Sequence, residues 1–329
     1  MAATSTTERA FAVLRRHWHP VALSDEIDEG PIGVNLLGTR LVVFRTAGTV
    51  GVAIDRCPHR GSPLSLGGYV DDGLTCPYHG LRFGADGSCI GFPSRPNARL
   101  PKRLDLETMH CAEQHGLIWA CLEEPSGSVP DWSIFDRPDA QTFQIGPTRW
   151  QASASRVAEN FNDLAHFPTI HRETFGPAER PVAVQKIDET QAGFTSTVGV
   201  FQQYRNTLDG SVEVVEAQYR YDFTFPFSSM LTITYPDGEL ECVQMTALPE
   251  SETSSLVFQQ SARTNLGGDA VEPWRDFQAA VNEEDRVICE SLGPRDVPFA
   301  LDHPGEVALP TDTFSIAYRR LWRTTLESA

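Results

Sequence analysis

The stretch from residue 160 to residue 171 reads NFNDLAHFPTIH and places one aspartate close to two histidines. Residues 153–165 contain no Pro or Gly and repeat apolar side chains at helical spacing, which predicts a helix. Asp163 and His166 are three residues apart and would share one face of that helix. Because Pro168 lacks a backbone donor and disfavours helical backbone before it, we expect the helix to break between the two histidines. Such a break would let both imidazoles reach one metal ion and leave its other face open.

Two similar segments precede this stretch: residues 57–61 read CPHRG and residues 76–80 read CPYHG. Their candidate ligands are Cys57, His59, Cys76 and His79. Two thiolates and two neutral imidazoles match a [2Fe–2S] cluster that has cysteines on one iron and histidines on the other. Structural zinc is the alternative, but zinc fingers usually group Cys with Cys and His with His. The mixed segments therefore favour the iron–sulfur cluster.

A cluster of this kind transfers one electron and does not transform a substrate, so a second centre is needed. Two histidines and one carboxylate with open positions form the ligand set of non-haem iron(II) oxygenases. Residues 274–292 have the period of a helix, and Asp285 lies close to its apolar stripe. A surface acid paired with Arg286 is the alternative interpretation of Asp285. Asp163 is the second candidate ligand, although its spacing from His166 suits orienting that imidazole equally well.

The composition excludes several classes of protein. The chain has 329 residues, 40% of them apolar and 22% charged, which is ordinary for a globular protein of one or two domains. A net charge of −17 argues against partners such as nucleic acid or an anionic membrane surface. Seven irregularly spaced cysteines favour metal ligands and buried thiols over disulfides. We expect a cytoplasmic protein, since no signal peptide or membrane-spanning run is visible.

The order of predicted elements indicates a small β domain followed by an α+β domain. A short helix is predicted within residues 1–16, and hairpins at 41–54 and 81–90 with a buried strand at 117–122 suggest a sandwich or barrel. We interpret residues 123–149, rich in Pro, as the connection between domains. Later elements comprise three β-rich stretches (182–204, 212–235 and 240–264) and two helices (274–292 and 314–326). A broad antiparallel sheet gripping helices fits this order.

The two Cys/His segments, followed by the pattern Asn160-x₂-Asp163-x₂-His166-x₄-His171, resemble the Rieske non-haem iron oxygenases. The acidic pair before Arg286 and the closing sequence IAYRR are most similar to the branch of vanillate and dicamba O-demethylases and caffeine N-demethylases. The resemblance implies an N-terminal all-β Rieske domain over residues 1–130. It implies a helix-grip catalytic domain with a large antiparallel sheet over residues 131–329.

The resemblance also implies roles for individual residues. The expected ligands of the mononuclear iron are His166, His171 and Asp285. Asp163 is expected to connect a histidine on this iron to His59 or His79 of a neighbouring subunit in a head-to-tail homotrimer. Asn160 matches a polar position beside the iron.

The activity implied is that of a terminal oxygenase in aromatic compound catabolism. It would use O₂ to hydroxylate or oxidatively demethylate a small aromatic or heterocyclic substrate. Electrons would come from NAD(P)H through a separate flavin- and ferredoxin-type reductase, directly or through a ferredoxin, because the chain has no Gly-rich nucleotide motif. Two alternatives remain open at this point: a dioxygenase that forms arene cis-diols, and a Rieske electron carrier without oxygenase chemistry.

Overall fold

The computed structural model describes residues 6–175, 182–205, 212–264, 271–292 and 305–328. The chain divides into two compact units, residues 1–129 with 248–251 and residues 130–247 with 252–329. The first five residues of the predicted N-terminal helix lie outside the described residues. None of the helices described is long and apolar enough to cross a membrane.

The described part of the first unit contains one α-helix, two short 3-10 helices and three small antiparallel sheets. After α1 (Thr6–Leu14), one sheet has the order β1 (His19–Leu23), β10 (Leu117–Cys121), β9 (His110–Gln114). The second has the order β2 (Ile32–Leu36), β3 (Thr39–Thr46), β4 (Thr49–Ile54). The third has the order β5 (Gly68–Val70), β6 (Gly73–Thr75), β7 (Arg82–Phe83), β8 (Cys89–Gly91). Both predicted hairpins are therefore present, and every residue of β10 is buried as expected.

The loops that carry the paired Cys and His residues are attached to a hydrophobic core. Cys57 and Cys76 are buried and belong to the same cluster as Phe44, Leu74 and Phe83. Burying these side chains is the main favourable contribution to folding such a small β structure. The backbone at both cysteines is thereby anchored to the sheets.

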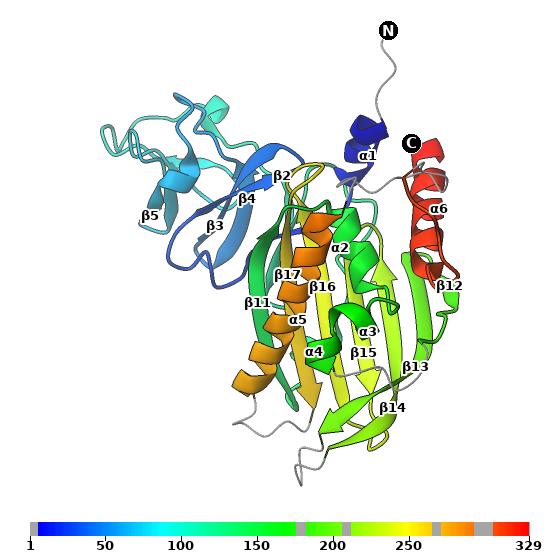
Figure 1. The fold of residues 1–329 in the computed structure, drawn as a ribbon. Helices are drawn as coiled ribbons and strands as arrows, with labels where there is room; N and C mark the ends of the chain where they lie inside the picture. The colour runs from blue at the N-terminus through cyan, green and yellow to red at the C-terminus, as the bar shows by residue number, and fades with distance from the viewer. Residues whose placement is uncertain (1–5, 176–181, 206–211, 265–270, 293–304, 329) are drawn as a thin grey trace. The chain divides into compact units, whose positions relative to one another are not determined.

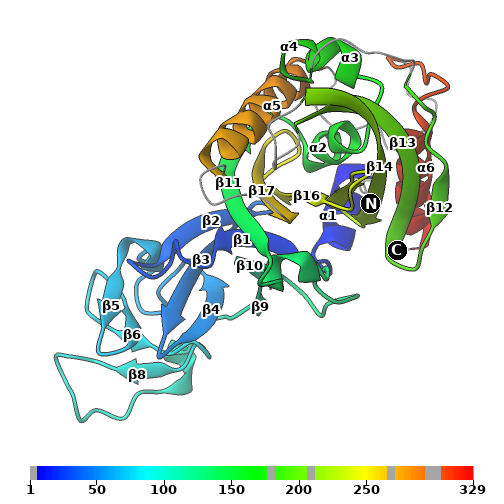
Figure 2. The same ribbon diagram turned by 90° about the horizontal axis from the view of Figure 1, so that it is seen from below.

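The second unit is built on one seven-stranded antiparallel sheet (Figure 1). Its order is β11 (Ala140–Trp150), β17 (Ser255–Thr264), β16 (Leu240–Pro249), β15 (Ser228–Thr234), β14 (Val212–Thr224), β13 (Gly193–Arg205), β12 (Ile187–Glu189). The helices are α2 (Ala154–Phe161), α3 (Phe167–Ile170), α4 (Arg172–Phe175), α5 (Val271–Ser291) and α6 (Thr313–Ser328). Figure 2 shows the sheet curving around α2, with α5 on the same side. The α+β class and the sheet that grips helices are confirmed.

The helix-facing side of this sheet follows the period of two expected for strands. Tyr219 and Tyr221 of β14 are opposite Ile233 and Leu231 of β15, and all four belong to one buried cluster. Leu164, from the segment that carries the histidines, packs into the same cluster. The sheet core therefore helps to position that segment.

Two predictions differ from the structure. The first is that residues 123–149 form only a connection: the boundary between the two units at 129/130 lies within them, but residues 140–149 belong to a strand. They include most of β11, an edge strand paired with β17. Gly146 and Pro147 suggest a turn in the sequence, but they lie where the register between the two strands shifts. An edge strand tolerates Pro, because one row of its backbone donors has no partner strand.

The second wrong prediction is the position of the helix break. α2 ends at Phe161, before both histidines, rather than between them. Asn162 donates from its side chain to the Ala158 carbonyl at 2.8 Å and to Ser229 Oγ at 2.7 Å, so it competes with continued helix. A new short helix, α3, then separates the histidines. Pro168 lies in its first turn, where a missing backbone donor costs nothing.

Candidate metal centres

The two Cys/His loops have the same backbone hydrogen bonds. Gly61 N–H donates to the Cys57 carbonyl at 2.8 Å, and Gly80 N–H donates to the Cys76 carbonyl at 3.0 Å. Both glycines have left-handed backbone, with φ of 77° and 70°, which other residues adopt at a cost. Each cysteine N–H in turn donates to a carbonyl five residues later at 2.8 Å. The two loops therefore present their side chains in equivalent ways.

The side chains of these loops meet as two pairs. The rings of His59 and His79 have centroids 4.6 Å apart, and His59 is exposed. The buried thiol of Cys57 lies against that of Cys76. Burial and the neighbouring Cys76 raise the pKa of Cys57 to about 11, although the backbone N–H of His59 acts in the opposite direction. Buried thiolates need a cation, so the donor set fits a cluster with both sulfurs on the inner iron and both imidazoles on the outer one.

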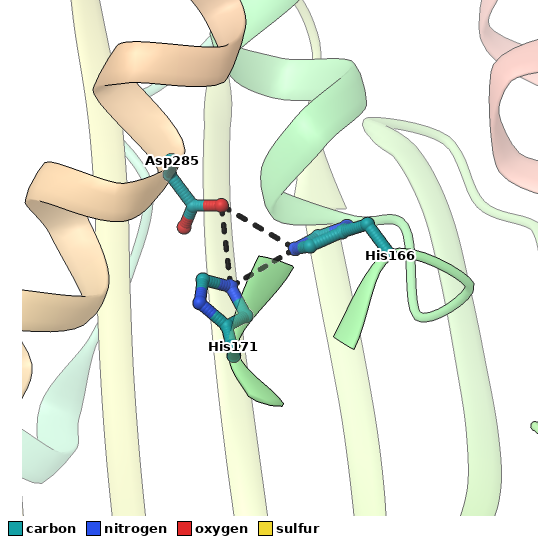
Figure 3. Close-up of side chains that lie close together, drawn as sticks. All are labelled: His166, His171 and Asp285. Carbon is teal, nitrogen blue, oxygen red and sulfur yellow. Dashed lines mark hydrogen bonds and ion pairs between the residues drawn. The ribbon is translucent and has the colours of Figure 1, made fainter. Parts of the chain in front are cut away.

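The second candidate centre brings together side chains from two segments (Figure 3). His166 Nε2 and His171 Nε2 are 3.1 Å apart, and Asp285 Oδ1 lies 3.3 Å from the first and 3.2 Å from the second. Among the described residues, these three form a group that could hold a metal ion. Ligand atoms at right angles, each roughly 2.1 Å from one metal, would be about 3.0 Å apart. The triangle thus has the dimensions of three adjacent ligands on one side of a six-coordinate ion.

The outer nitrogens of both histidines face carboxylates. Asp163 Oδ2 lies 3.0 Å from His166 Nδ1, and Glu284 Oε2 lies 2.7 Å from His171 Nδ1. Each Nδ1 can therefore donate a proton to its carboxylate, and with a metal bound each neutral ring would present the lone pair of Nε2 to the centre. Two nitrogen lone pairs and a carboxylate oxygen then converge at close range. They would repel one another without a cation, so this donor set fits a divalent metal.

The pKa values of His166 and Asp285 indicate the same requirement for a positive charge between these side chains. Burial by itself would lower the pKa of His166, but its hydrogen bonds to Asp163 and Asp285 outweigh burial and raise it to about 9. Burial would raise the pKa of Asp285, yet its bonds to His166 and His171 lower it to about 2. The site therefore keeps a negative carboxylate and attracts a positive charge, either a proton or a metal ion.

Asn160 contacts the third member of the group. Its Nδ2 donates to Asp285 Oδ1 at 3.1 Å, so the amide orients the carboxylate from the end of α2. Asp163 accepts the Ala165 N–H at 2.9 Å as well as bonding His166. The structure thus places both polar residues of the sequence motif against members of this candidate metal-binding group. The four Cys and His residues form a separate group in the first unit.

The buried face of α5 differs from the expected apolar stripe. Its buried side chains are Trp274, Gln278, Asn282, Asp285 and Cys289, whereas Leu292 is exposed. The face is polar because Trp274 Nε1 and Gln278 Nε2 both donate to the buried Glu241 carboxylate, each at 3.0 Å. The spacing of apolar residues in the sequence cannot identify the buried face of a helix when that face packs against polar groups.

Glu284 was not assigned a role from the sequence, nor was Thr174, which donates to Glu284 Oε1. Adjacent residues on a helix point in different directions, so a second acid beside Asp285 could reach a different atom of the same site. The position of Glu284 beside Asp285 was the available sequence signal. It does not identify a role for Glu284 until the position of His171 is known.

Comparison with protein families assigns both halves of the chain. Residues 17–110 match the Rieske [2Fe-2S] domain, and residues 150–328 match the vanillate O-demethylase oxygenase C-terminal domain. The methylxanthine N1-demethylase NdmA of Pseudomonas putida is 30% identical over 96% of this chain and 90% of its own length. The oxygenase component of dicamba O-demethylase from Stenotrophomonas maltophilia is 29% identical over 86% of this chain and 88% of its own.

Solved structures agree with this assignment. The structure of NdmA from Pseudomonas putida with caffeine superposes with a TM-score of 0.84 at 29% identity, over 97% of this chain and 93% of that one. Dicamba monooxygenase bound to 3,6-dichlorosalicylic acid has the same fold, with a TM-score of 0.82.

Proposed function

The chain belongs to the Rieske non-haem iron oxygenases, and from this premise we propose which residues carry its reaction and what it acts on. It is the terminal oxygenase component of a multicomponent system, an oxidoreductase whose cofactors are a Rieske [2Fe–2S] cluster and a mononuclear iron. Its nearest reaction class is that of the demethylating monooxygenases, with O₂ as co-substrate.

Cys57, His59, Cys76 and His79 hold the cluster in this proposal, within a Rieske domain of residues 1–130. The equivalent loops, the adjacent thiols and the adjacent imidazoles support it. The exposed position of His59 suits electron transfer, because an electron must leave the cluster towards another protein surface.

His166, His171 and Asp285 hold the mononuclear iron within a catalytic domain of residues 131–329. The single observation that carries this assignment is the convergence of two Nε2 atoms and one Oδ1 within 3.3 Å of one another. When bound there, iron supplies the oxidising chemistry that inserts one atom of O₂ into a substrate C–H bond. The residues themselves keep three adjacent ligand positions filled and leave the opposite side for substrate and O₂.

Asp163 connects the two centres in this proposal. It holds His166 Nδ1, and its side chain keeps 31% of its surface exposed, so it can accept a further hydrogen bond from His59 or His79 of a neighbouring subunit. This route requires a head-to-tail homotrimer. A separate reductase, directly or through a ferredoxin, would bring electrons from NAD(P)H, and the cytoplasm is the compartment that supplies NAD(P)H and reduced thiols.

We propose an N-methylated or O-methylated small aromatic or heterocyclic compound as substrate. The relatives named above are an N-demethylase and an O-demethylase. Hydroxylation of a methyl group on N or O gives a hemiaminal or hemiacetal, which breaks down to formaldehyde and the demethylated compound.

A screen of methoxylated and N-methylated aromatics tests this function. With a surrogate reductase, an accepted substrate should release one formaldehyde for each O₂ and each NAD(P)H consumed. Unsubstituted arenes serve as the matched controls. Conversion of those arenes into diols containing both atoms of labelled O₂ would instead assign cis-dihydroxylation. An iron content of about two rather than about three per chain would assign a plain electron carrier.

A further inference from the structure

We propose that Glu284 is a positioning residue that holds His171 for the mononuclear iron, a task distinct from that of Asp163. The inference rests on the proposed function, because it takes His171 as a ligand. It assigns the two carboxylates behind the histidines to different tasks: Glu284 retains the metal, and Asp163 serves electron transfer.

Glu284 is held at both of its oxygens. Its Oε2 accepts from His171 Nδ1 at 2.7 Å, and its Oε1 accepts from the hydroxyl of Thr174. Thr174 belongs to α4, which directly follows His171. Glu284 therefore connects α5 to residues 171–174 at two points, beside the contact that Asp285 makes with His171 Nε2.

The two histidines differ in burial, although the side chains of Asp163 and Glu284 are similarly exposed, at 31% and 28%. The side chain of His171 is 1% exposed, whereas that of His166 is 14% exposed. If Asp163 is removed, water can reach His166 and replace the lost acceptor. If Glu284 is removed, the buried His171 loses both a charged acceptor at Nδ1 and the connection through Thr174, which one water molecule does not restore.

Aromatic rings among the described residues also contact His171. Its ring packs against the rings of Phe175 and Phe167, at centroid distances of 4.9 Å and 5.5 Å. Aromatic faces limit how the imidazole tilts, but they cannot select which nitrogen carries the proton. Glu284 makes that selection, because accepting from Nδ1 leaves the lone pair of Nε2 for the metal.

The elements that carry Asp163 and Glu284 are consistent with different tasks for the two carboxylates. Asp163 bonds His166 and Ala165 within its own loop, so losing it breaks no connection between elements. Glu284 and Asp285 are neighbours on α5, and both contact the segment that carries His171. Retention of the metal therefore depends on the pair from α5.

The test is the dissociation constant of the mononuclear iron, measured anaerobically by competition with a chelator. Glu284→Ala should raise it by about 10- to 100-fold, the usual effect of losing the partner behind a histidine ligand. Glu284→Gln and Thr174→Val should raise it less, since each keeps part of the connection. Asp163→Asn, the matched control, should change it by less than about 3-fold. The cluster absorption should stay unchanged in all four, which shows that the first unit is intact, and unchanged far-UV circular dichroism should show the same for the second unit.

Equal constants for Glu284→Ala and wild type would overturn this inference, and so would equal losses in Glu284→Ala and Asp163→Asn. Should Glu284→Ala fail to fold, Glu284→Gln decides, because an unchanged constant there also overturns it. A wild-type protein that binds no iron beyond the cluster would instead refute the proposed function itself.

Discussion

Each residue of the proposed mononuclear site is held by a polar neighbour. Asp163 supports His166, Glu284 supports His171, and Asn160 supports Asp285. Such partners fix the direction of each lone pair before the metal arrives, so less ordering is needed on binding. Substitutions of the proposed metal ligands and of the polar residues that bond them should therefore have different consequences.

Asp285→Ala should abolish binding of the mononuclear iron, because it removes one of three protein ligands and the only carboxylate among them. The cluster, held in the other unit, should remain. Iron analysis together with the visible spectrum measures the content of mononuclear iron and of cluster. The matched comparison is Asp163→Asn, which should keep both kinds of iron yet lose nearly all turnover. Retention of full iron in Asp285→Ala would contradict the ligand assignment.

His19 illustrates a residue whose effect is on stability. It is buried, and its Nε2 donates to the Leu14 carbonyl at 2.9 Å. Burial lowers the pKa of His19 from 6.5 to about 4; the bond to Leu14 acts in the opposite direction, and the nearby His17 lowers the pKa further. Between these two pH values the unfolded chain binds a proton that the folded chain refuses, so stability falls as pH falls.

Acidification from pH 6.5 to 4 should therefore remove about 3 kcal/mol of stability through His19. His19→Gln keeps a donor near Leu14 without a titrating ring, so the slope of stability against pH should decrease in that range. Urea titration followed by loss of the cluster absorption reports on the first unit. Identical slopes for variant and wild type would show that His19 is not responsible.

At the scale of elements, a closed ring of charges joins α2 to α6. Glu159 of α2 accepts from Arg319 Nε at 2.6 Å and from its Nη2 at 2.9 Å. Glu306 lies 2.7 Å from Arg319 Nη1, and Arg156 bonds both carboxylates. α2 leads directly into residues 162–171, which carry His166 and His171. These ion pairs therefore hold the start of that segment against α6.

Arg319→Ala should destabilise the protein by about 3–5 kcal/mol, because it leaves the buried Glu159 carboxylate without its bidentate partner. Arg320, its exposed neighbour, is the control, and Arg320→Ala should change stability by less than about 0.5 kcal/mol. Urea unfolding followed by circular dichroism measures both. Adding Glu159→Gln to Arg319→Ala should recover part of the loss. A double variant no more stable than the single one would argue against an uncompensated charge.

For the whole molecule, the proposed trimer makes a prediction about mixed subunits. His59→Ala removes a cluster ligand and Asp285→Ala removes an iron ligand, so each variant alone should be inactive. In random heterotrimers, about a quarter of the interfaces should pair an intact cluster with an intact iron site. Co-expression with two affinity tags, followed by turnover assays, measures the recovered activity.

The control for this experiment mixes Asp163→Asn with Asp285→Ala. Both changes lie on the iron side of the proposed interface, so no combination restores a complete route and no activity should return. Equal activity in the two mixtures, or none in the first, would contradict transfer between subunits.

The sequence by itself determined the two metal-binding motifs and the class of fold. Ligand chemistry needs particular side chains at short spacing, and the Cys/His loops and the residues 160–171 display them within a few positions. Alternating strands such as β14 and the long period of α5 were equally visible, because each is a local pattern. These features require no knowledge of the rest of the chain.

Only the tertiary structure decided how the pieces meet. Glu284 bonds a histidine 113 residues away, and Asn160 bonds Asp285 across 125 residues, separations at which a local pattern carries no information. The early end of α2 has the same origin, since Asn162 bonds Ser229 on a distant strand. Residues 140–150 form the strand β11 because they pair with β17. Long-range hydrogen bonds and burial are properties of the folded chain, and they select among the local structures that the sequence allows.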